Sequence, residues 1–100
     1  MPNIQSAADY GLELCRLLKE YGIIERFGEL STPDTRENVA RFFVKLKERR
    51  KFPVLVVERA EFDNFVEFRV TMPEELRNKV YQSMDAKDAV KFNVKNVVLK

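Results

Sequence analysis

The residue types that perform most protein chemistry are scarce in this chain of 100 residues. It contains no histidine, the commonest general base and a common zinc ligand. Its single cysteine, Cys15, falls inside an apolar helical pattern, where a small half-buried hydrophobe is the expected role. The three glycines are isolated from one another, so they form no phosphate-binding loop. These observations predict that the protein is not an enzyme and holds no cofactor.

Paired carboxylates are the remaining candidates for chemistry. Glu74 and Glu75 follow a proline at an expected helix start, where the helix dipole favours negative charge. Asp85 and Asp88 could share a cation, but no further ligands and no calcium-loop glycine accompany them. We therefore expect no metal site.

A cluster of cations in the middle of the chain is the first candidate for binding. Its members are Lys45, Lys47, Arg49, Arg50 and Lys51. Residues 35–60 carry eight basic and three acidic side chains, a net charge of +5, whereas the whole chain carries +2. Such a cluster is typical either of the solvated end of a helix or of a surface that binds polyanions. The pI of 8.8 falls just below the value of about 9 that is common for nucleic-acid-binding domains.

Two runs of alternating apolar residues predict a β-hairpin over residues 54–61 and 65–72. A two-residue turn at Asp63-Asn64 places Glu58 opposite Arg69, whereas a four-residue loop would place Glu58 opposite Glu67, an unfavourable pair. One face of the hairpin is expected to join the core; it consists of Leu55, Val57, Val66, Phe68, Val70 and Met72.

The second candidate for binding is an aromatic pair at the tip of this hairpin. Phe62 and Phe65 lie on its mixed, partly polar face. They either cap the core or pack under the first helix, or they form an exposed pair that stacks on nucleic-acid bases or, together with Arg69, anchors a protein partner.

The remaining chain favours three helices and a last strand. Residues 4–21 form the first helix, with Ser6 at its start and Gly22 after its end. Residues 23–27 are either a short strand or an irregular segment. Residues 33–51 are predicted as the second helix, because Pro33 suits a helix start. The i, i+3, i+4, i+7 spacing that supports this helix is formed by Val39, Phe42, Phe43 and Leu46.

A third helix is expected to begin after Pro73, residues 85–90 form either a final turn or a loop, and residues 92–99 form the last strand. These elements predict a single α+β domain, residues 1–100, in the order α-α-β-β-α-β. Its small, mostly antiparallel sheet carries helices on one face. A helix pair before a hairpin also resembles part of a winged-helix domain, so a winged-helix-like topology is the alternative, although no third helix precedes the hairpin.

The function predicted from these features is a small non-enzymatic protein-interaction domain with an adaptor or regulatory role. The alternative is a nucleic-acid-binding domain that uses the basic end of the second helix and the hairpin. The N-terminal residues show no secretory signal, and one cysteine cannot form an internal disulfide, so a cytoplasmic location is expected. No membrane partner is expected, and an exposed strand edge offers a route to a homo-oligomer.

Overall fold

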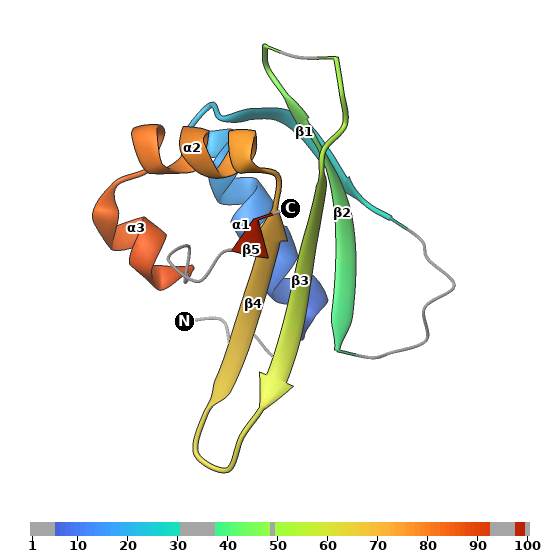
Figure 1. The fold of residues 1–100 in the computed structure, drawn as a ribbon, viewed down its shortest axis with the longest axis vertical. Coiled ribbons are helices and arrows are strands. Elements are labelled where there is room, and N and C mark those ends of the chain that lie inside the picture. The colour runs from blue at the N-terminus through green and yellow to red at the C-terminus, as the bar shows by residue number, and fades with distance from the viewer. Residues whose placement is uncertain (1–5, 31–37, 49, 93–97, 100) are drawn as a thin grey trace.

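The structure is a computed structural model that describes residues 6–30, 38–48, 50–92 and 98–99. A sheet of five strands in the order β1-β2-β3-β4-β5 forms its centre (Figure 1). Neighbouring strands from β1 to β4 run antiparallel, and β5 joins β4 in parallel. The elements are α1 (Ala7–Glu20), β1 (Ile24–Glu29), β2 (Val39–Leu46), β3 (Val54–Glu61), β4 (Val66–Met72), α2 (Glu74–Ser83), α3 (Ala86–Lys91) and β5 (Val98–Leu99). The predicted α+β class and the mostly antiparallel sheet are confirmed.

Helix α1 begins and ends as the sequence predicts. The Ser6 hydroxyl accepts a hydrogen bond from the Asp9 backbone N–H at 3.1 Å, which satisfies a donor that the first helical turn leaves unpaired. Gly22, just past the end, has a φ of 74°, a conformation that glycine adopts without strain. The helix packs across β1, β2 and β3 (Figure 1), and its buried side chains join those of the sheet and α2 in one core.

The predicted second helix is wrong where the structure describes that stretch, because Val39–Leu46 is strand β2. Its side chains alternate strictly, with Ala40, Phe42, Val44 and Leu46 buried and the residues between them half-buried. The spacing of the same apolar residues also fits a helical face. As a strand, however, this segment forms backbone hydrogen bonds on both sides, with β1 and with β3. Thr32 and Pro33, the expected helix start, lie outside the described residues. The structure also differs from the winged-helix-like alternative, since one helix and two further strands precede the hairpin in the described part of the chain.

The β3–β4 hairpin is confirmed in position and register. Glu58 lies opposite Arg69, and Val57 lies opposite Val70. At the turn, the Phe62 backbone N–H donates to the Phe65 carbonyl at 2.9 Å. The predicted core face is buried except at Val66, which is 39% exposed because the tip projects beyond the helices (Figure 1).

The C-terminal third differs from expectation mainly in its last strand. Helix α2 begins directly after Pro73, and the segment left as a turn or loop is helix α3, where the Asp85 carboxylate accepts from the backbone N–H of Lys87 at 2.8 Å. Phe92 directly follows α3 as a buried turn residue and is not part of a strand. Strand β5 spans Val98–Leu99, and residues 93–97 lie outside the described residues. No helix in the described ranges is long and apolar enough to cross a membrane.

Candidate protein-interaction surfaces

The hairpin tip carries an exposed aromatic pair. The rings of Phe62 and Phe65 stack with their centroids 4.7 Å apart and their planes 18° apart. Phe62 is 49% exposed and Phe65 is 59% exposed, so the rings do not pack beneath α1. Cross-strand aromatic stacking helps to hold the turn, while the outer ring surfaces stay available. Arg69, the third residue predicted for this site, is exposed on β4 opposite Glu58.

The sheet face opposite α1, here called the open face, is not crossed by any described helix (Figure 1). Its side chains are those of the strand positions that alternate with the buried ones. They are Arg41, Phe43 and Lys45 on β2, Val54, Val56 and Glu58 on β3, and Glu67 and Arg69 on β4; Thr71, the next β4 position on this face, is buried. The open face is therefore apolar toward the start of β3 and charged toward the hairpin tip.

Of the five cations predicted to bind polyanions, Lys45 lies on β2, and Lys47, Arg50 and Lys51 lie in the connection to β3, not on a helix end. The Lys45 ammonium lies 3.1 Å from the Glu25 carboxylate, so its charge is partly neutralised. Lys47 lines a separate hollow at the end of α2. Arg50 and Lys51 are exposed in the connection. Arg49 lies outside the described residues.

At the apolar end of the open face, two adjoining hollows lie on either side of Pro73. The first has a volume of about 240 Å³ and is lined by Leu46, Lys51, Phe52, Pro53, Pro73 and Glu75. The second has a volume of about 300 Å³ and is lined by Val54, Val56, Thr71, Met72 and Pro73. We call the two hollows together the groove, with Phe52, Pro53, Val54, Val56, Thr71 and Pro73 as its walls.

A stack of one cation and two aromatic rings borders the groove. The Arg26 guanidinium lies 5.2 Å from the centroid of the Phe52 ring, a cation–π contact. Phe52 meets Phe43 edge to face at 5.7 Å. The Phe43 ring lies so close over Gly28 that a Cβ there would be 2.3 Å from it. Sequence analysis missed this arrangement because it placed Phe43 on a helix. The alternation of Arg41, Phe43 and Lys45 was the signal that could have found it.

Two titratable side chains, Cys15 and Tyr21, have pKa values that their surroundings raise. Burial raises the pKa of the Cys15 thiol to about 12, so the thiolate needed for nucleophilic chemistry does not form near neutral pH. The Tyr21 hydroxyl donates to the Asp88 carboxylate and lies 3.4 Å from that of Asp85. The hydrogen bond to Asp88 raises the pKa of Tyr21 to about 12. Across the described part of the chain, no group of three or more histidine, cysteine or acidic side chains could hold a metal ion.

No protein-family model matches the chain, and neither the curated proteins nor the solved structures contain a significant match to it. The chemistry of the tip and the groove is therefore the basis for a functional argument.

Proposed function

We propose that this protein is a small non-enzymatic protein-interaction domain that uses the hairpin tip as an anchor. The observation that carries the proposal is the stacked, half-exposed pair of Phe62 and Phe65 at the end of a projecting hairpin. Large aromatic side chains that enter a partner's pocket commonly supply about 2 kcal/mol or more of binding free energy each. Stacking holds the two rings in place beforehand, which reduces the entropy lost on binding.

The neighbouring residues support an anchor of this kind. Val66, the residue after Phe65, is also exposed, and Arg69 with Glu58 supplies a polar rim of both charges. A partner with a concave apolar pocket fits this surface, and a second copy of the chain is one such partner. Cys15 is a buried free thiol, which agrees with the reducing cytoplasmic setting that forms part of the proposal.

Nucleic-acid binding is the second candidate, and the cations near the start of β3 favour it. Arg50 and Lys51 are exposed there, and Arg26 lies beside them over Phe52. The ion pair between Lys45 and Glu25 weakens this candidate, because it offsets part of the positive charge that phosphate contacts require.

Site-specific photo-crosslinking tests the proposal and separates the two candidates. The substitution Phe65→p-benzoylphenylalanine places a photoreactive ring at the tip, and Tyr81→p-benzoylphenylalanine on α2 is the matched control, because Tyr81 is also an exposed aromatic residue. Irradiation in native extract is expected to give a protein adduct from position 65 that survives nuclease treatment and is absent from position 81. An adduct formed only by the chain itself would identify a second copy as the partner.

The adduct should also disappear in competition with unlabelled wild-type protein but not with Phe62→Ser combined with Phe65→Ser. That double variant is expected to remain folded, because both side chains are about half exposed. Equal adducts from both positions, or adducts that nuclease removes, would refute the tip as a protein anchor.

A further inference from the structure

The groove and the hairpin tip lie at opposite ends of β3. Val54 is the first residue of that strand, and Phe62 directly follows its last residue. Seven strand steps of about 3.3 Å separate Val54 from Glu61, which amounts to roughly 23 Å. A pocket that takes only the two tip rings does not extend over that distance, so the groove is a surface separate from the tip.

The walls of the groove suit aliphatic side chains. Val54 is 43% exposed and Phe52 is 48% exposed, and Val56, Thr71 and Pro73 complete the surface between them. These side chains offer apolar contact and few hydrogen-bonding groups. Pro73 lines both hollows. Two neighbouring hollows of this kind can each accept one apolar side chain of an extended or helical segment.

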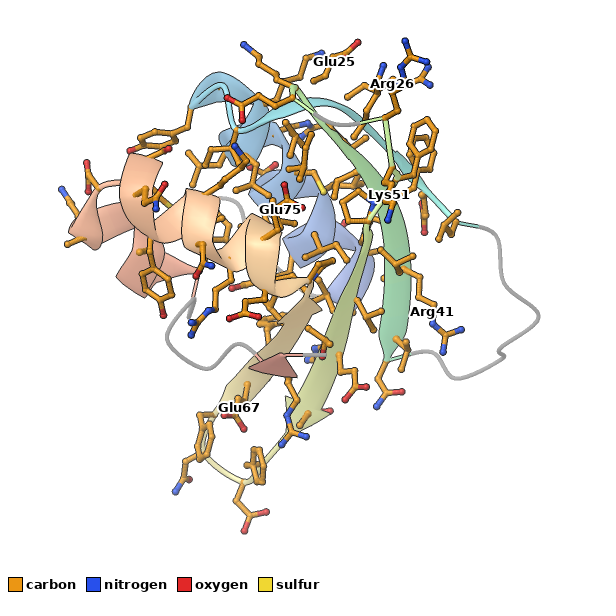
Figure 2. All side chains as sticks on the ribbon, turned by 45° about the horizontal axis from the view of Figure 1, so that its top comes forward. Glu25, Arg26, Arg41, Lys51, Glu67 and Glu75 are labelled. Atoms are coloured by element: carbon orange, nitrogen blue, oxygen red, sulfur yellow. The ribbon has the colours of Figure 1, made fainter. Side chains whose placement is uncertain are left out.

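The charges beside the groove are mostly positive. Lys51 lines the first hollow, Arg26 lies over Phe52, and Arg41 is opposite Val56 in the pairing of β2 with β3. Figure 2 shows Arg26 and Arg41 on the side of β2, and Glu75 on the side of α2. Arg26 and Lys51 favour an occupant with negative charge on the β2 side, because complementary charges orient a partner and suppress wrong ones.

We infer that the groove binds an acidic segment of a partner protein that carries two apolar side chains. The apolar side chains fill the two hollows, and aspartate or glutamate residues beside them face Arg26 and Lys51. A single-stranded nucleic acid fits less well, because bases bind by stacking on exposed aromatic faces. Here the Phe52 ring is already covered by Arg26 on one face and contacts Phe43. The inference goes beyond the proposed function and does not depend on the tip.

A library of random 16-residue peptides displayed on phage, selected on the immobilised full chain, tests this inference. Enriched peptides are expected to contain two apolar residues within about five positions and an excess of acidic residues. The dissociation constant of the best synthetic peptide should rise at least tenfold in Val54→Ser combined with Val56→Ser. The same rise is expected in Arg26→Glu combined with Lys51→Glu, and it should shrink at high salt.

The matched control reverses the same number of charges on the opposite layer of the molecule. Arg16 and Lys19 are exposed on α1, so Arg16→Glu combined with Lys19→Glu should leave peptide binding within twofold. The tip double variant should also retain full binding. If the Val54 and Val56 double variant does not fold, the Arg26 and Lys51 double variant still tests the inference. It changes surface side chains and is expected to remain folded.

Several results would overturn the inference. Enriched peptides without acidic residues, or binding that the groove variants leave unchanged, would remove the groove as their site. Peptides that lose affinity only in the tip variant would support the proposed function and refute the groove. Displacement of the peptide by an equimolar 20-residue oligothymidylate, or an increase in mass during sedimentation without any peptide, would assign the groove to nucleic acid or to a second copy.

Discussion

Gly11 in α1 lies directly against the Phe42 ring in β2. A Cβ on Gly11 would lie 2.1 Å from Cε2 of Phe42, and the Phe42 side chain is fully buried. Because the ring is buried in the core, moving it disturbs its neighbours, so Gly11→Ala should cost about 3 kcal/mol through overpacking. The alanine recovers about 1 kcal/mol through its higher helix propensity. The free energy of unfolding should therefore fall by about 2 kcal/mol.

Urea unfolding followed by circular dichroism measures this change, and a double-mutant cycle assigns it. Combining Gly11→Ala with Phe42→Leu removes the clashing ring atoms, so the double variant should be more stable than the two separate losses predict, by about 1–2 kcal/mol. Gly28 and Phe43 provide the matched control. A Cβ on Gly28 would also collide with a phenylalanine ring, but Phe43 is half-buried on the open face and can turn outward. Gly28→Ala should therefore cost about 1 kcal/mol or less.

Additive effects within about 0.5 kcal/mol in the Gly11 and Phe42 cycle would refute the reasoning. They would mean that the Phe42 ring does not lie against α1, and the assignment of Val39–Leu46 to a strand with Phe42 on its core face would fail with it.

Two further predictions concern titratable side chains. Cys15 is buried and its pKa is raised to about 12, so Ellman's reagent at pH 8 should label the thiol only as fast as the protein unfolds. Rapid labelling of the native protein would contradict the burial of Cys15. The hydrogen bond to Asp88 raises the pKa of Tyr21 from 10.0 to about 12, which means that the folded state favours the protonated phenol. This stabilisation is complete below pH 10 and is lost as the pH rises from 10 through 12. The stability difference between wild type and Tyr21→Phe should therefore shrink from pH 9 to pH 12, and a constant difference in urea midpoints would exclude the effect.

Local signals allowed the hairpin and the first helix to be predicted from the sequence. The opposite charges of Glu58 and Arg69 indicated the register that the structure has, and Ser6 and Gly22 marked the ends of α1. Both arguments use residues close together in the chain, whose interactions depend little on the rest of the fold.

The second strand could not be predicted in the same way, because Val39–Leu46 fits both periodicities. Its apolar residues at i, i+3, i+4 and i+7 form a helical face, while its alternation fits a strand. Pairing with β1 and β3 decides between them, and that pairing is tertiary. The groove was missed for the same reason, since Arg26, Phe52 and Pro73 come from three separate segments that only the completed sheet brings together.

The order of the strands in the sheet affects how the chain folds. Each antiparallel pair joins strands that are consecutive in the sequence, so short connections close these contacts at little entropic cost. The parallel pairing of β4 with β5 is the exception, because α2 and α3 lie between these two strands in the sequence. The domain should thus nucleate within the four-stranded meander and attach its C-terminal end late.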